Sequence, residues 1–114
     1  MRCLLFSTLL LAVTCSSAMA NYYQDGNKLS DYCAMKGVPF AEGMCAGYIV
    51  GATDAFEIGR VLKGQPFCLR QGILVEQIVD VVKKYLSDHP EFRDVGGANL
   101  VEAALTQAFC KANQ

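Results

Sequence analysis

The chain is poor in the side chains that carry out acid–base and metal chemistry. It has a single histidine, His89, and its six cysteines include no Cys-x-x-Cys pair. A zinc ribbon or a thioredoxin-like redox centre therefore lacks its usual signature. No Ser/His/Asp set and no phosphate-cradling glycine loop stands out either. We therefore predict that the protein is not an enzyme and that it holds no metal ion or cofactor.

An excess of charge of one sign is missing as well. Ten Lys and Arg stand against eleven Asp and Glu, which gives a formal net charge of −1 at pH 7. Nucleic-acid binding calls for a basic stripe. An electrostatic hold on anionic lipid calls for a basic cluster. The composition therefore predicts neither nucleic acid nor a membrane surface as a partner of the mature protein.

The start of the chain has the pattern of a secretory signal peptide. Arg2 supplies a positive charge, and an apolar run over residues 4–13 follows it. Ala18-Met19-Ala20 is a small-x-small cleavage site, so Asn21 is the expected mature N-terminus. The apolar run is far shorter than the roughly 20 residues of a membrane span. We expect residues 1–20 to be removed during export.

Export also determines how the cysteines are interpreted. A lipid anchor on Cys15 is the weaker alternative to cleavage, because Thr14 stands where a smaller residue is expected. Residues 21–114 then form one small domain. An even number of cysteines in such a domain predicts two disulfides, for which three connectivities exist. The four cysteines are Cys33, Cys45, Cys68 and Cys110.

Hydrophobic periodicity predicts an all-α fold, a small disulfide-stapled bundle of about four helices. Gly37 with Val38-Pro39, the turn at residues 63–66, and Pro90 are the stop signals. The expected helices cover residues 28–36, 40–62, 73–88 and 98–112.

Short connections favour antiparallel neighbours, and this geometry suggests how the cysteines pair. Cys33 and Cys45 flank the Val38-Pro39 turn, whereas a helical hairpin returns Cys110 to the neighbourhood of Cys68. We expect Cys33–Cys45 and Cys68–Cys110. Loop-closure entropy gives these bonds about 3 and about 4 kcal/mol. Together they are comparable to the whole stability of a small domain.

The segment 40–62 carries a small residue at every fourth position. On a helix these residues form one ridge, and they leave a shallow groove where another backbone can approach closely. Its charged residues argue against insertion into a membrane. Each glycine costs about 0.5–1 kcal/mol relative to alanine in a helix interior, so the helix needs tertiary contacts. We expect the groove to pack a neighbouring helix of the same domain or of a second copy. The small residues are Gly43, Gly47, Gly51, Ala55 and Gly59.

Three side chains are candidates for catalysis. Asp54 and Glu57 lie three residues apart on one helix and could present paired carboxylates. We favour the simpler interpretation, a solvated helix face. His89 precedes Pro90 at a helix end, where a histidine is expected to cap carbonyl groups rather than to act as a base.

The loop from His89 to Gly97 is the best exposed candidate for binding a partner. Phe92 is an aromatic residue among charged ones, which is the composition of an interface anchor with a polar rim. The alternative is that Phe92 folds under the loop as a plug on the core. The residues predicted to bind a partner are His89, Glu91, Phe92, Arg93 and Asp94.

Four motifs, in this order, resemble the Rap/Tai family. Cys45-Ala46-Gly47-Tyr48-Ile49-Val50-Gly51-Ala52-Thr53-Asp54 is similar to the family's Cys-x-Gly-Tyr-Ile-x-Gly-x-x-Asp helix. The other three motifs are Phe67-Cys68-Leu69, residues 77–86 followed by His89-Pro90-Glu91, and residues 100–110. Two departures are Arg70 in place of a common proline, and Phe109-Cys110 without a proline between them. They leave open which toxin this copy recognises.

Rap/Tai proteins are periplasmic immunity proteins that neutralise amidase toxins of the type VI secretion system. The resemblance implies that this chain occludes the active-site cleft of a peptidoglycan amidase in the periplasm. It also implies that the toxin contacts involve loops and helix ends, and that the protein can form a homodimer.

Two other functions are kept as alternatives. A periplasmic helical chaperone of the acid-stress type fits the eleven carboxylates and the glycine-lined groove. It would bind hydrophobic dye and prevent aggregation at low pH, which an immunity protein need not do. A small hydrolase would need an activity that depends on His89, Asp54 or Glu57.

Overall fold

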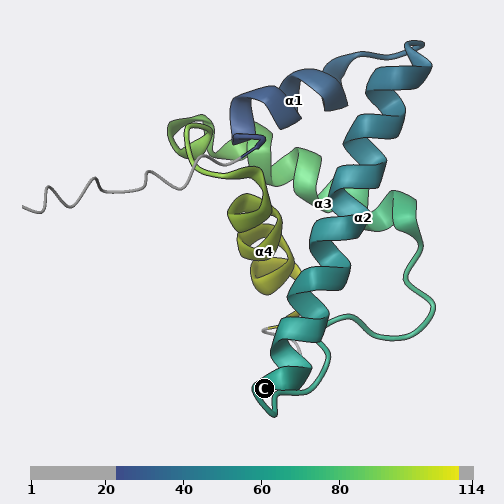
Figure 1. Ribbon diagram of the computed structural model, residues 1–114. Helices are drawn as coiled ribbons and strands as arrows, with labels where there is room; N and C mark the ends of the chain where they lie inside the picture. The colour runs from purple at the N-terminus through teal and green to yellow at the C-terminus, as the bar shows by residue number, and fades with distance from the viewer. Residues whose placement is uncertain (1–22, 111–114) are drawn as a thin grey trace, which may run out of the picture.

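The computed structural model describes residues 23–110, so the predicted signal peptide and its cleavage site lie outside the described range. Within that range the chain forms helices and a single isolated bridge between Asp25 and Gly96. The elements are α1 (Gly26–Ala34), α2 (Pro39–Leu62), α3 (Val75–Asp88), the short 3₁₀ turn η1 (Pro90–Phe92) and α4 (Gly97–Ala108) (Figure 1). The predicted all-α bundle of four helices is confirmed.

Local chemistry explains where α1 and α2 begin and end. Asp25 caps α1, because its carboxylate accepts a hydrogen bond from the Lys28 backbone N–H at 2.8 Å. The helix therefore starts two residues before the predicted Lys28, and it ends at Ala34 instead of Lys36. Gly37 adopts a φ of +74°, a conformation that favours glycine. Pro39 then occupies the first turn of α2, where its missing N–H costs nothing.

Helices α3 and α4 also differ from the prediction at their ends. α3 begins at Val75 rather than Ile73, with the Gln77 side chain accepting a hydrogen bond from the Leu74 N–H at 2.8 Å. α4 begins at Gly97 and ends at Ala108, four residues before the predicted end. Residues 111–114 lie outside the described range.

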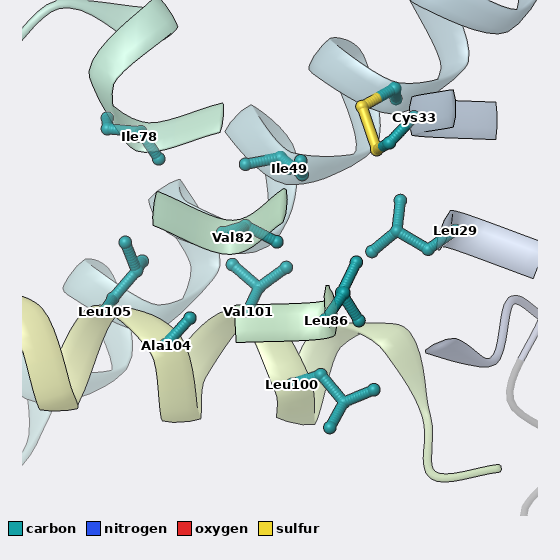
Figure 2. Close-up of a cluster of buried hydrophobic side chains, with 11 residues drawn as sticks. Leu29, Cys33, Ile49, Ile78, Val82, Leu86, Leu100, Val101, Ala104 and Leu105 are labelled. Carbon is teal, nitrogen blue, oxygen red and sulfur yellow. A yellow bond between two sulfur atoms is a disulfide. The ribbon is translucent and has the colours of Figure 1, made fainter. Parts of the chain in front are cut away.

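The core forms where one side of α2 meets the other three helices. Every fourth residue of α2 from Ala41 to Glu57 is buried. Figure 2 shows Val82 of α3 between Ile49 of α2 and Val101 of α4. The core cluster is completed by Leu29, Cys33, Cys45, Ile78, Leu86, Leu100, Ala104 and Leu105.

Both predicted disulfides are present. Cys33–Cys45 joins α1 to α2, and Cys68–Cys110 joins the α2–α3 connection to the second residue after the end of α4. The bonds span sequence separations of 12 and 42 residues. They therefore tie α1 to α2, and the end of the described chain to the connection between α2 and α3.

The predicted packing of the glycine ridge inside the domain is wrong. A Cβ built on Gly43, Gly47, Gly51 or Gly59 meets no atom within 4 Å. The reason is that α2 buries the row that starts at Ala41, and residues two positions further along lie on the opposite side of a helix. The ridge therefore faces outward, and only its expected packing on a second copy remains. No described helix has the length and hydropathy needed to cross a membrane.

Candidate partner-binding site

The predicted partner-binding residues come together in one turn between α3 and α4. His89 is the C-cap residue that follows α3, and the 3₁₀ turn η1 begins at the next residue. Glu91, Phe92 and Asp94 are exposed, whereas His89 and Arg93 are partly buried. The sequence therefore located a surface turn with both acidic and aromatic groups on it.

Three aromatic rings follow one another along this turn. The ring centroids of Tyr85 and His89 lie 4.4 Å apart. Those of His89 and Phe92 lie 5.8 Å apart in a stacked arrangement. Phe92 keeps 46 % of its surface exposed, so it is not the plug on the core that the sequence left as an alternative. Its ring is held by His89 and still presents an apolar face to solvent.

Arg93 satisfies the end of α3, a role that the sequence had suggested for His89. The Nε–H of Arg93 donates a hydrogen bond to the Leu86 carbonyl at 2.7 Å. A cation at a helix C-terminus is also favoured by the helix dipole. His89 Nδ1 instead lies 3.3 Å from Glu91 Oε1. Sequence could place both basic side chains near the helix end but could not decide which one reaches back to it.

Glu91 is held in its charged form by its surroundings. The backbone N–H of Glu91 itself lowers the pKa of its carboxyl, and the hydrogen bond and charge of His89 lower it further. On the preceding turn, Lys84 Nζ and Asp88 Oδ2 form an exposed ion pair at 2.7 Å. The turn thus presents an exposed carboxylate that lies next to His89.

Backbone hydrogen bonds fix the second half of the turn to the segment that leads into α1. Gly26 N–H donates to the Val95 carbonyl at 2.9 Å, and Asn27 N–H donates to the Arg93 carbonyl at 2.8 Å. Gly97 N–H donates to the Gln24 carbonyl at 2.8 Å. The two segments, residues 24–27 and 93–97, therefore hold each other in place.

Glycine is required where these two segments touch. A Cβ on Gly26 would collide with the Leu100 side chain and approach the Arg93 Cα and carbonyl oxygen at 2.9 Å. Backbone atoms cannot move aside as a flexible side chain can. The close approach that positions the turn thus depends on Gly26 having no side chain.

A shallow cleft of about 230 Å³ runs beside the turn between α3 and α4. Tyr85 and His89 belong both to this cleft and to the row of rings, so the projecting turn and the hollow are continuous. The remaining lining residues are Val81, Lys84, Asp88, Ala104, Gln107 and Ala108.

The proposed carboxylate pair on α2 does not exist, and the solvated face expected for it is wrong for Glu57. Asp54 is exposed, but Glu57 is only 8 % exposed. Its two oxygens accept hydrogen bonds from the Cys68 N–H at 3.1 Å each, and Oε1 also accepts one from the Leu69 N–H at 3.0 Å. Glu57 therefore anchors the α2–α3 connection next to the Cys68–Cys110 disulfide. Glu57 lies four residues after Thr53 in the buried row, and no sequence signal revealed that this row is buried.

Within residues 23–110, no three His, Cys, Asp or Glu side chains are grouped so as to hold a metal ion. What the site offers is an aromatic face, carboxylates and a fixed backbone. Such a site can bind another protein by burying Phe92 within a polar rim.

These features define a small all-α protein that is stapled by two disulfides. The family model of the Rap1a immunity proteins matches residues 25–110, so the chain belongs to this family. The match runs from the cap of α1 to the last disulfide cysteine and covers the whole described fold. No curated protein and no solved structure matches the chain. Family membership implies an inhibitor rather than an enzyme.

Proposed function

We propose that the protein is a periplasmic immunity protein, which binds a peptidoglycan amidase of the type VI secretion system and blocks its active-site cleft. Membership of the Rap1a immunity protein family supports this proposal. The observation that carries it is the turn at residues 89–97, which projects from the helices and is tied to residues 24–27 by three backbone hydrogen bonds. A turn held in one conformation loses little entropy when it enters a cleft.

In this proposal the turn binds the toxin through one apolar side chain and two charged ones. Phe92 is the apolar anchor, because its ring is held by His89 and half of it is free to be buried. Glu91 and Asp94 supply charged acceptors beside it. A carboxylate placed in this way could accept hydrogen bonds from a catalytic Cys/His pair of the toxin. Charge-assisted hydrogen bonds of this kind are about twice as strong as neutral ones.

A second copy of the chain is the other partner in this proposal. Figure 1 shows the turn on the left of the molecule and α2 on the right. A pair formed through the outer side of α2 would therefore leave both turns free for toxin.

A protection assay tests the antidote role. Candidate amidases would be directed to the periplasm of a host cell, with or without this protein, and lysis would be followed by turbidity. We expect rescue by the full chain and no rescue by a chain lacking residues 1–20. Lysis with every amidase would contradict the antidote role. Dye binding and protection against aggregation at low pH would then favour the chaperone alternative.

Two surface variants test the role of the turn. Charge reversal by Glu91→Lys with Asp94→Lys should abolish rescue, whereas Glu76→Lys, an equally exposed reversal in the first turn of α3, should not. Phe92→Ala should weaken toxin binding by at least about tenfold in calorimetry, since anchors at the centre of an interface cost about 2 kcal/mol or more when truncated. Leu74→Ala removes an exposed apolar side chain elsewhere and should leave affinity unchanged. Unchanged affinity in Phe92→Ala would exclude this turn as the anchor.

A further inference from the structure

A second hollow adjoins the turn, between α1 and α3. Its volume is about 210 Å³, and Arg93 of the turn lines it. The cleft of about 230 Å³ lies between α3 and α4, so α3 separates the two. The other polar residues that line the hollow are Ser30 of α1 and Lys83 and Ser87 of α3. The turn therefore stands beside two hollows of different composition.

The charged residues of this hollow are of one sign. Lys83 and Arg93 line it, and no Asp or Glu is among its described lining residues. Both cations are partly buried, which ordinarily favours pairing with an opposite charge. The ion pairs found within residues 23–110 join other residues, so neither of these cations is paired with a carboxylate there.

The Arg93 guanidinium is held in place and keeps donors for a further partner. Its Nε–H donates to the Leu86 carbonyl at 2.7 Å, and the Arg93 carbonyl accepts from the Asn27 N–H at 2.8 Å. A guanidinium has five N–H donors, and the bond to Leu86 uses one of them. The two terminal NH₂ groups form a planar fork that matches the two oxygens of a carboxylate.

The ends of the neighbouring helices do not balance the charge of the hollow. Ala34, the last residue of α1, and Ser87, close to the end of α3, both line it. Each helix C-terminus carries about half a negative charge, so two of them offset about one positive charge. Lys83 and Arg93 supply two. A net positive charge therefore remains for a ligand to neutralise.

The positive surface continues into the next hollow along α1. That hollow has a volume of about 140 Å³ and shares Cys33 and Lys83 with the first. Lys36 adds an exposed cation. Glu42 lines it as well, but its Oε1 accepts a hydrogen bond from the Gly37 N–H at 2.8 Å. The whole chain has a net charge of −1, so the cations are concentrated here against the overall composition.

The carboxylates of the turn favour a ligand that carries both signs of charge. Glu91 and Asp94 are exposed on either side of Arg93 in the sequence. A polyanion such as a nucleic acid would be repelled by these two carboxylates. A segment of a folded protein can place one carboxylate in the hollow while its other groups face Glu91 and Asp94.

We infer that the hollow between α1 and α3 binds a carboxylate side chain from an acidic segment of the partner protein. The Arg93 fork donates two parallel hydrogen bonds to it, and Lys83 supplies a second positive charge. The hydroxyl groups of Ser30 and Ser87 are further donors in the lining. The inference rests on the proposed function for the identity of the partner, since a toxin that binds Phe92 reaches the same turn.

The first experiment uses no toxin. The disulfide-bonded, isotopically labelled protein would be titrated at low salt with the peptide acetyl-Glu-Glu-Glu-amide and followed by NMR. We expect saturable shifts at residues 30, 83, 87 and 93, and none with acetyl-Gln-Gln-Gln-amide. Lys83→Gln should weaken binding of the acidic peptide about fivefold, the upper range for a solvent-accessible ion pair. Thermal unfolding would show that the variant is folded.

The matched control is Lys84→Gln, which removes the same charge from the next residue of α3. Lys84 lines the cleft on the other side of the helix, so peptide affinity should stay unchanged. Absence of saturable shifts, or equal weakening in both variants, would overturn the inference. Inorganic phosphate is the second probe. Phosphate that binds as tightly as the peptide, with the same shifts, would indicate a general anion site and would overturn the choice of a protein carboxylate.

The second experiment uses an amidase that the protein neutralises. In calorimetry, Lys83→Gln should lower the affinity about fivefold, whereas Lys63→Gln, an exposed lysine after α2, should not change it. Unchanged affinity in Lys83→Gln would overturn the toxin as the source of the carboxylate. Peptide binding that depends on Lys83, without protection from any amidase, would support the hollow and contradict the proposed function. Protection without peptide binding would contradict the hollow alone.

Discussion

The inner and outer rows of α2 repeat with the same four-residue spacing and have opposite environments. The inner row is buried, and its two polar members have partners. Thr53 donates to the Ile49 carbonyl at 2.7 Å, and Glu57 accepts from two backbone N–H groups. The outer row has almost no side chains, and a Cβ on any of its four glycines would meet no atom of residues 23–110 within 4 Å. The inner row is Ala41, Cys45, Ile49, Thr53 and Glu57, and the outer row is Gly43, Gly47, Gly51, Ala55 and Gly59.

Burial in α2 therefore depends on whether a residue finds hydrogen-bonding or packing partners in the fold, and not on whether its side chain is apolar. A carboxylate is acceptable inside because hydrogen bonds replace the water that it loses. The small residues remain outside because no part of residues 23–110 packs on the four glycines among them.

The largest effect is expected from the centre of the inner row. Ile49 is fully buried in the core cluster, so Ile49→Ala removes apolar contacts and leaves a cavity. We expect the free energy of unfolding to fall by about 3 kcal/mol in urea denaturation. A loss below about 1 kcal/mol would mean that the core around α2 is loosely packed.

Gly26 has close neighbours, in contrast to the glycines of the outer row. Gly26→Ala would press its methyl group on the Arg93 backbone, and relief would require the turn to shift. We expect a loss of about 2 kcal/mol in the same measurement, as for other overpacked sites. Since the turn moves, toxin affinity should fall as well. Retained stability would show that residues 24–27 do not fix the turn.

A substitution at Glu57, the polar end of the inner row, should lower the free energy of unfolding somewhat less. Glu57→Gln replaces a charged acceptor of the Cys68 and Leu69 N–H groups by a neutral one. We expect a loss of about 1–2 kcal/mol. Amide exchange measured by NMR should increase at residues 68 and 69 and stay unchanged in α1. Equal protection in both proteins would contradict the anchoring role.

A substitution in the outer row should raise the free energy of unfolding instead of lowering it. In urea denaturation, Gly51→Ala should raise the free energy of unfolding by about 0.5–1 kcal/mol, because alanine favours a helix interior and no described atom lies within 4 Å of the added methyl group. A loss of stability would mean that this side of α2 is packed in the folded protein.

The smallest effect concerns pH. The folded turn lowers the pKa of Glu91, so its contribution is present above the pKa of the unfolded chain and is lost as pH falls through the lower folded value. We expect the Glu91 carboxyl to titrate at lower pH in the folded protein than in a peptide of residues 88–95, by NMR. His89→Ala should shift that titration upward, since it removes the second cause of the lowering. Identical titration curves for protein and peptide would contradict the held carboxylate.

Much of the fold could be predicted from the sequence, since its clearest signals are local. Pro39 and Pro90 mark helix boundaries, and Gly37 lies in the turn between the first two helices. With four helices in a known order, the pairing of the cysteines followed. The turn that carries Phe92 could likewise be located from its composition.

The orientation of α2 could not be predicted, because hydrophobic periodicity is weak in that helix. Its buried row includes Thr53 and Glu57, whereas its exposed face includes Phe40 and Ile58. Polar residues inside and apolar residues outside cancel the usual pattern. Whether Arg93 or His89 closes the end of α3 depends on contacts between side chains that only the folded chain brings together.

The two disulfides make folding of this chain dependent on oxidation. They close loops of 12 and 42 residues, and together they stabilise the fold by about 7 kcal/mol in the loop-entropy model. A domain of this size has a total stability of the same order. We therefore expect a freshly synthesised chain with free thiols to populate the folded helices poorly. Oxidation of the four cysteines is then the step that commits the chain to its fold.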